Sequence, residues 1–251
     1  MKYSVCVEAV FRGLPFTDGM KEVKKAGFDT FEFWGWWNKD LDAILKAKNE
    51  LGLTLSTFCT RFISLVEEEK RDEYLAGLRE SIDAAKKLGC TSLITQVGNE
   101  LADRPRSRQH ESLVAGLKSC VPILETSGIT LLFEPLNTLV NHKGYYLWSA
   151  DEAFEIADEV GSPWVKILYD IYHQQIMDGH LISRISGNIG KIGHFHSAGN
   201  PGRNELWKGE INYPEIFKAI DASGYQGYVG LEYFPLEDAA AGLARLRDYY
   251  K

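Results

Sequence analysis

The fold is decided by the stretch GITLLFE (residues 128–134), in which a glycine, a short apolar run and a carboxylate follow one another directly. A glycine commonly ends a helix, and a short apolar run after it is typical of a buried strand. Five further glycines stand between a helical pattern and an apolar run in the same way: Gly27, Gly52, Gly89, Gly161 and Gly224. This repeated order predicts parallel strands with helices on the outside.

Over the whole chain the pattern gives eight strand–helix units. We expect strands at residues 3–8, 28–34, 53–59, 91–97, 129–134, 165–170, 191–196 and 227–232. We expect helices at residues 18–26, 41–51, 67–88, 108–125, 150–160, 174–185, 214–222 and 236–249. Because closed barrels of this kind take about 250 residues, the chain predicts a single (β/α)8 TIM barrel, one α/β domain over residues 1–251. The rival, a doubly wound open sheet, would carry Gly-x-Gly-x-x-Gly after its first strand, and this chain does not.

Composition narrows the classes of partner. A net charge of -7 disfavours nucleic acid and anionic membranes, because both bind through an excess of Lys and Arg. The sequence has neither a long uninterrupted apolar run nor the charged-then-apolar pattern of a signal peptide. Its four cysteines are widely spaced, which is atypical of a disulfide framework or a structural zinc site. We therefore expect a cytoplasmic protein that acts on a small molecule.

Four metal-ligand side chains stand at the ends of the last four expected strands: Glu134, Asp170, His196 and Glu232. A single acid at a strand end is commonly a solvated charge or the N-cap of the next helix. Here the separations are 36, 26 and 36 residues, so the four side chains come from neighbouring units of the barrel. In such barrels the chemistry lies at the carboxyl ends of the strands. Three carboxylates and one imidazole suit a hard divalent cation such as Mn²⁺ or Mg²⁺, with Co²⁺ as a substitute.

Several motifs carry a family resemblance. They are FEPLN (133–137), YDIYHQQ (169–175), GHFH (193–196), NPGR (200–203), GEINY (209–213) and GLEY (230–233). With them the chain resembles the hydroxypyruvate isomerase group of the xylose-isomerase-like TIM barrels, which also contains ketose 3-epimerases. The resemblance covers the whole barrel and is densest from about residue 129 to residue 235.

The resemblance implies roles for individual residues. Glu134, Asp170, His196 and Glu232 would bind the metal, and Glu134 and Glu232 would also form the acid–base pair. His173 and Arg203 would hold the oxygens of the substrate. Trp34 and Asn137 are further substrate-binding candidates, whereas Glu8, Glu32, Gln96 and His142 are better interpreted as structural. His194 alternates with His196 and is expected to be structural or to support a ligand. The ketose 3-epimerase branch carries an acid six positions after its first metal glutamate, where this chain has Val140.

These features favour a divalent-metal-dependent isomerase of a small hydroxy-carbonyl compound, either a carbohydrate or a hydroxy-keto acid. Moving a proton next to a carbonyl group creates an enediolate, which a cation stabilises while two carboxylates exchange the proton. The preferred prediction is hydroxypyruvate isomerase-like activity of the aldose–ketose type. The alternatives are a ketose 3-epimerase, a metal-dependent lyase acting on a keto-sugar, and a non-catalytic sugar-binding module. Assembly into a homo-oligomer is compatible with the sequence.

Overall fold

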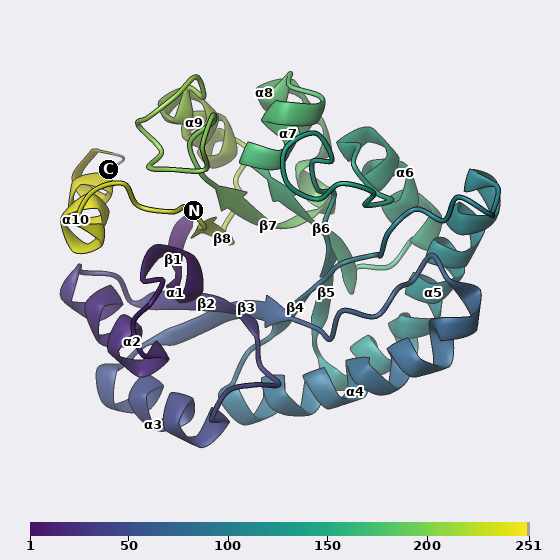
Figure 1. Cartoon of the computed structure of the whole chain (residues 1–251), viewed down its shortest axis with the longest axis horizontal. Helices are drawn as coiled ribbons and strands as arrows, with labels where there is room; N and C mark the ends of the chain where they lie inside the picture. Colours follow the sequence, from purple (N-terminus) through teal and green to yellow (C-terminus); the bar gives the residue numbers. More distant parts are fainter. Residues whose placement is uncertain (250–251) are drawn as a thin grey trace.

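Eight parallel strands close into a barrel in the computed structural model, which describes residues 1–249. The strands are β1 (Lys2–Cys6), β2 (Thr30–Gly35), β3 (Thr54–Cys59), β4 (Ser92–Thr95), β5 (Thr130–Phe133), β6 (Val165–Asp170), β7 (Ile192–Ser197) and β8 (Tyr228–Leu231). Each strand pairs with its neighbour in the chain, and β1 pairs with β8, with Val5 opposite Leu231. The expected (β/α)8 TIM barrel is therefore confirmed (Figure 1).

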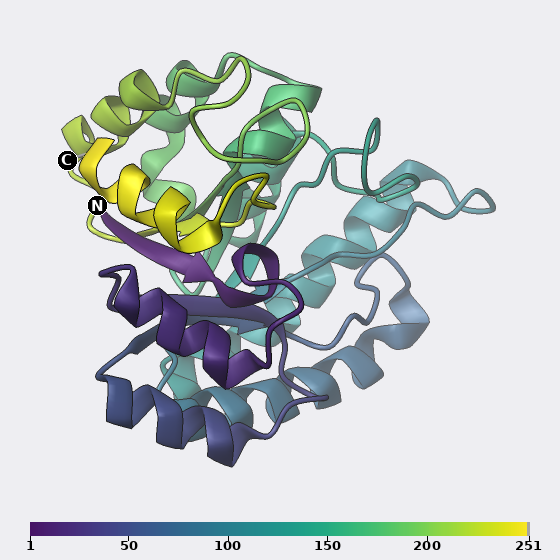
Figure 2. The same cartoon turned by 60° about the vertical axis from the view of Figure 1, so that its left-hand side comes forward.

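Helices surround the barrel. They are α1 (Val7–Val10), α2 (Phe16–Lys25), α3 (Leu41–Leu51), η1 (Glu68–Lys70), α4 (Arg71–Leu88), α5 (Arg106–Ser127), α6 (Ala150–Val160), α7 (Ile171–Met177), α8 (Leu181–Asn188), η2 (Ile189–Lys191), α9 (Tyr213–Ala222) and α10 (Ala239–Tyr249). Figure 2 shows α2 and α3 packed side by side on the outside of the first strands. None of the helices within residues 1–249 combines the length and apolar character needed to cross a bilayer.

Two expected elements differ from the structure. The first strand ends at Cys6, and Glu8 lies in the short helix α1 instead. The single helix expected at residues 174–185 is two helices, because Gly179 and His180 both have positive φ values, 59° and 51°, and end the first of them. Helix α7 also begins earlier than expected, since the side chain of Asp170 accepts hydrogen bonds from the backbone N–H groups of Tyr172 and His173.

The barrel interior contains both an apolar and a polar layer. Most of the core lies between the strands and the helices, whereas a small separate cluster fills the inside of the barrel: Cys59, Ile94, Leu132 and Leu168. The polar layer consists of buried side chains joined by hydrogen bonds: Ser4, Glu32, Ser56 and His194. Barrel interiors are usually filled by branched apolar residues, so a carboxylate there calls for an explanation.

Close packing across the strands gives a stability prediction. A Cβ atom at Gly193 would lie 2.5 Å from Cδ2 of Leu132 and 3.1 Å from Cβ of Lys166, so Gly193→Ala should lower the free energy of unfolding by about 1–3 kcal/mol. Urea unfolding followed by circular dichroism measures the change. The control is Gly187→Ala in α8, where no atom lies within 4 Å and alanine should cost nothing. Equal midpoints for Gly193→Ala and wild type would contradict this packing.

Candidate active site

The four predicted ligand residues meet at one end of the barrel. Asp170 ends β6, His196 lies near the end of β7, and Glu134 and Glu232 directly follow β5 and β8. All four side chains are buried. Nδ1 of His196 lies 3.3 Å from Oε2 of Glu232 and 3.8 Å from Oε1 of Glu134. The parallel barrel thus brings together residues almost 100 positions apart in the chain.

Ligand-type atoms within this cluster form two overlapping groups. Asp170, His196 and Glu232 each offer one atom within 4.8 Å of the others, and so do Glu134, Asp170 and His173. Asp170 belongs to both groups and links them. Nδ1 of His196 is buried and has no hydrogen-bond partner among the described residues, so its lone pair is available to a cation. Three carboxylates and one free imidazole nitrogen fit a divalent cation.

The electrostatic environment differs between the two glutamates. Burial raises the pKa of Glu134 well above its usual range, and Asp170 and Glu232 raise it further, although His196 opposes them. Burial also acts to raise the pKa of Glu232, but the charges of Arg203 and His196 outweigh it and hold that pKa well below its usual range. Two carboxyl groups whose pKa values are shifted in opposite directions are the arrangement expected of an acid–base pair.

Arg203 lies over the carboxylates from the loop that follows β7. Its guanidinium contacts Glu232, lies 3.7 Å from Asp170, and stacks near the rings of Tyr172 and Phe234. The residue has a positive φ of 57°, which is uncommon outside glycine. Its carbonyl accepts a hydrogen bond from the backbone N–H of Phe234, which holds the loop against the end of β8. The structure therefore brings Arg203 to the cluster, as the resemblance implied.

His173 is oriented by Asn137. The Nδ1 atom of His173 lies 3.2 Å from the backbone nitrogen of Asn137 and 2.6 Å from its side-chain nitrogen. The side-chain oxygen of Asn137 accepts from the backbone N–H groups of Val140 and Asn141, so its amide must point the nitrogen toward His173. Burial lowers the pKa of His173 well below its usual value and keeps the ring neutral. With Nδ1 accepting, the single ring proton is on Nε2.

That proton decides what His173 can do. Nε2 is buried, has no hydrogen-bond partner among the described residues, and lies 3.5 Å from Oδ2 of Asp170. A protonated nitrogen can donate to an oxygen but cannot bind a metal ion. His173 is therefore suited to hold a substrate oxygen, although it lies close enough to the cluster to look like a ligand. Asn137 was expected to bind the substrate; it is fully buried behind His173 and does not line the cavity.

Trp34 belongs to the wall of the site. Its indole N–H donates to Oε1 of Glu232 at 2.5 Å, and its backbone N–H donates to Glu8. Lys39 lies 2.8 Å from the other oxygen of Glu8 and so holds in place the carboxylate that accepts from Trp34. The tryptophan thus adds a hydrogen bond to Glu232 as well as the apolar surface that the sequence suggested.

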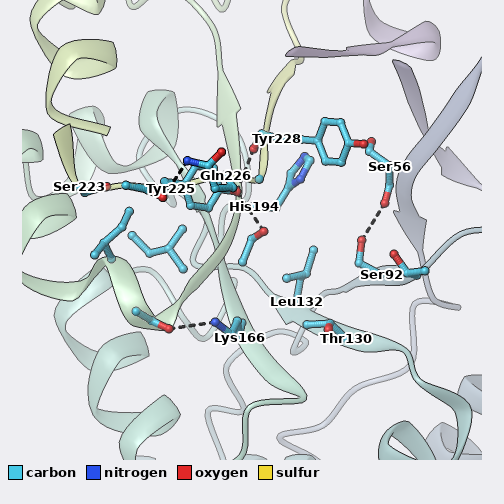
Figure 3. A pocket seen from close by; sticks show the side chains of 17 residues that line it. Ser56, Ser92, Thr130, Leu132, Lys166, His194, Ser223, Tyr225, Gln226 and Tyr228 are labelled. Atoms are coloured by element: carbon cyan, nitrogen blue, oxygen red, sulfur yellow. Dashed lines mark hydrogen bonds between the residues drawn. The ribbon is translucent and has the colours of Figure 1, made fainter. Parts of the chain in front are cut away.

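The cluster opens into a cavity of about 280 Å³. Its walls comprise Trp34, Cys59, Phe62, Ile94, Gln96, Glu134, Leu136, His142, His173, His196, Arg203, Glu232 and Phe234. Sequence reasoning missed Cys59, Phe62, Ile94, Leu136 and Phe234, and treated Gln96 and His142 as structural. Cys59 and Phe234 could have been found, because each lies at or just after the end of a strand. A larger cavity of about 490 Å³ lies at the opposite end of the barrel, where the strands begin, away from the carboxylates (Figure 3).

Comparison with known proteins agrees with this architecture. A family model described as xylose isomerase-like TIM barrel matches residues 20–249. Hydroxypyruvate isomerase of Escherichia coli is 33% identical over 99% of this chain and 99% of its own length. A solved structure described as AP endonuclease, family 2, from Brucella melitensis has a TM-score of 0.93 and 29% identity, covering 100% of this chain and 99% of the other. The chain belongs to the xylose isomerase-like TIM barrel family.

A more distant structure shares the fold alone. L-ribulose 3-epimerase superposes with a TM-score of 0.82 at 20% identity, covering 99% of this chain and 93% of the other. The resemblance inferred from the motifs is confirmed by the family match. The similarity to the curated relative supports an enzyme of the isomerase kind.

Asp170 gives a test of the metal cluster that leaves the helix cap in place. Asp170→Asn keeps an oxygen that can accept from the backbone N–H groups of Tyr172 and His173, so α7 should stay capped. It removes one negative charge from the donor set, and we expect the affinity for Mn²⁺ to fall by about tenfold or more. Isothermal titration calorimetry measures the affinity, and circular dichroism checks the fold. An unchanged Mn²⁺ affinity in a folded variant would rule out this cluster as the metal site.

Proposed function

Because the chain belongs to the xylose isomerase-like TIM barrel family, we propose that it isomerises a small α-hydroxy carbonyl compound of the hydroxypyruvate type, with the help of a divalent metal ion. The observation that carries the proposal is the pair Glu134 and Glu232. Both carboxylates are buried at one cavity, and their pKa values are shifted in opposite directions. Such a pair suits the movement of one proton between two carbon atoms.

Glu134, Asp170, His196 and Glu232 would hold the metal ion, with Mn²⁺ or Mg²⁺ as the expected ion and Co²⁺ as a substitute. When bound, the ion supplies positive charge that stabilises the oxygen anion developing on the substrate. This donor set is supported by the unpartnered Nδ1 of His196 and by the three carboxylates around it.

In the proposed reaction one carboxylate removes the proton from C3 of hydroxypyruvate, leaving an enediolate. A proton is then returned to C2, and the hydroxyl proton moves from the C3 oxygen to the C2 oxygen, which gives the aldehyde isomer. Glu232 is the better candidate for the base, because Arg203 and the indole N–H of Trp34 stabilise its ionised form. Glu134 is the better candidate for the proton donor.

Substrate binding would rest on donors that converge on the cavity. The Nε2–H of His173 is free to donate to a substrate oxygen, and the guanidinium of Arg203 can hold a carboxylate or a hydroxyl group. The cavity is at the small end of the range of about 300–1,000 Å³ typical of ligand sites, which favours a short substrate. A charged three- or four-carbon acid matches these features.

One contact that a ketose 3-epimerase would use has no counterpart here. The ketose 3-epimerase branch has an acid at the position of Val140, where it would grip substrate hydroxyls. Here Val140 is 61% exposed and does not line the cavity. The longer row of hydroxyl groups on a ketose would therefore lack that contact.

Hydrogen exchange with the solvent is the direct test. The purified protein, with Mn²⁺, is incubated in D₂O with hydroxypyruvate, 2-oxo-tetronates, and pentuloses or hexuloses, and the products are followed by NMR. We expect deuterium incorporation and an aldehyde product from a hydroxy-keto acid. Exchange at C3 of a ketose would identify an epimerase, loss of water a lyase, and binding without exchange a sugar-binding module.

The two glutamates are predicted to be needed for turnover. Glu134→Gln and Glu232→Gln each keep the size and an oxygen of the side chain but cannot take up or release a proton at physiological pH. We expect turnover to fall by about 10²-fold or more, the usual scale for losing a general acid or base. Substrate binding should stay measurable. Steady-state kinetics at saturating Mn²⁺ measure the effect, and a variant with near-normal turnover would remove that glutamate from the role.

Arg203 and His173 are predicted to act on the substrate. Because neither belongs to the proposed ligand set, Arg203→Ala and His173→Ala should raise KM or lower kcat/KM while the Mn²⁺ content stays near that of the wild type. Metal analysis beside kinetics separates the two effects. Loss of metal in step with activity in both variants would show that the assignment to substrate binding is wrong.

A further inference from the structure

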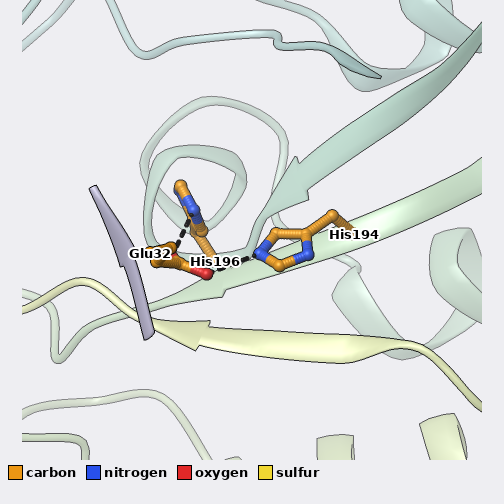
Figure 4. A group of neighbouring side chains, drawn as sticks. All are labelled: Glu32, His194 and His196. Carbon is orange, nitrogen blue, oxygen red and sulfur yellow. Dashed lines mark hydrogen bonds and ion pairs between the residues drawn. The ribbon is translucent and has the colours of Figure 1, made fainter. Parts of the chain in front are cut away.

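The polar layer inside the barrel contains a carboxylate that the proposed reaction does not use. Glu32 of β2 is only 2% exposed. Its Oε2 lies 3.0 Å from Nε2 of His194 and accepts a hydrogen bond from the hydroxyl of Ser56 at 3.1 Å. Its Oε1 lies 2.9 Å from Nε2 of His196. Figure 4 shows the carboxylate between the two imidazole rings.

The contact with His196 joins two atoms that have no hydrogen-bond partner. Within the described residues, neither Oε1 of Glu32 nor Nε2 of His196 makes a hydrogen bond, and the 2.9 Å between them is an ion-pair distance without hydrogen-bond alignment. The other nitrogen of the ring, Nδ1, faces Glu134 and Glu232. Glu32 therefore lies on the far side of His196 from the catalytic carboxylates. A carboxylate at Nε2 keeps a proton on that nitrogen and leaves the lone pair of Nδ1 for a metal ion.

We propose that Glu32 is a positioning residue, which sets the ring orientation and the tautomer of His196 so that Nδ1 can bind the divalent cation. This inference rests on the proposed function, because it takes His196 to be a metal ligand. Glu32 does not touch the cavity and is not a catalytic residue.

Neighbouring residues keep Glu32 in place. Ser56 is itself held by a hydrogen bond with the hydroxyl of Ser4, 2.7 Å away. Gly230 of β8 leaves the room that the pair needs: a Cβ atom there would lie 2.2 Å from Oε1 of Glu32 and 2.6 Å from Cδ2 of His196. Gly230 of β8 and Ser56 of β3 thus both support the contact between Glu32 and His196, although their strands lie on different sides of β1.

The energetics also argue against a purely packing role. Burying a carboxylate is costly, and an apolar side chain of similar volume commonly gives equal or greater stability. A carboxylate retained inside the barrel, with Oε1 2.9 Å from Nε2 of His196, is explained if it orients that ring.

The test compares Glu32→Gln with Ser56→Ala. Glu32→Gln keeps the shape of the side chain but removes the charge that holds the proton on Nε2 of His196. We expect the affinity for Mn²⁺, measured by calorimetry without substrate, to fall by about 10–100-fold. Ser56→Ala removes a hydrogen bond to the other oxygen of the same carboxylate, so it should lower the melting temperature yet leave the Mn²⁺ affinity within about threefold of the wild type.

Two further outcomes keep the inference separate from the proposed function. If Asp170→Asn loses Mn²⁺ affinity and a folded Glu32→Gln does not, the metal site stands and the role of Glu32 is wrong. If the wild type and Asp170→Asn bind Mn²⁺ equally, the proposed metal site itself fails. Should Glu32→Gln not fold, Glu32→Asp decides: it keeps the charge but draws it back from His196, and an unchanged affinity there overturns the inference.

Discussion

The burial of several carboxylates in one place is the constraint on which the rest of the site depends. Glu134, Asp170 and Glu232 are removed from water within reach of one another, and each ionised group penalises the others. Positive charge must therefore come from the protein or from a bound cation. Arg203, whose guanidinium contacts Glu232, supplies part of it.

Around these carboxylates, each of two imidazole rings that face the site contacts a polar side chain on its other side. Asn137 accepts two backbone N–H groups and directs its nitrogen at His173, which leaves the Nε2–H of that ring free at the cavity. Glu32 likewise contacts one ring nitrogen of a histidine, Nε2 of His196, from inside the barrel. In both cases the opposite nitrogen of the imidazole faces the site, so the supporting residue determines whether the ring acts as a donor or as a ligand.

The sequence was sufficient to predict the structural features that repeat along the chain or depend on neighbouring residues. The recurring glycine and apolar run predicted six of the eight strands, because those units repeat the same helix end and buried strand. The convergence of the four ligand residues followed from their positions at strand ends. The expected helix bounds were wrong where a side-chain contact or the backbone conformation sets them. Helix α7 starts early because the carboxylate of Asp170 caps it. The helix expected up to residue 185 breaks where Gly179 and His180 adopt positive φ.

The remaining misses are contacts across the barrel. Glu32 and His196 are 164 positions apart, and no local pattern in β2 distinguishes a carboxylate that reaches β7 from one that faces solvent. Asn137 contacts Nδ1 of His173, and its position in the sequence does not reveal this contact. A strand-end motif identifies which residues reach the mouth of a barrel. The direction of each side chain depends on partners from other strands, and those partners become visible only when the barrel is closed.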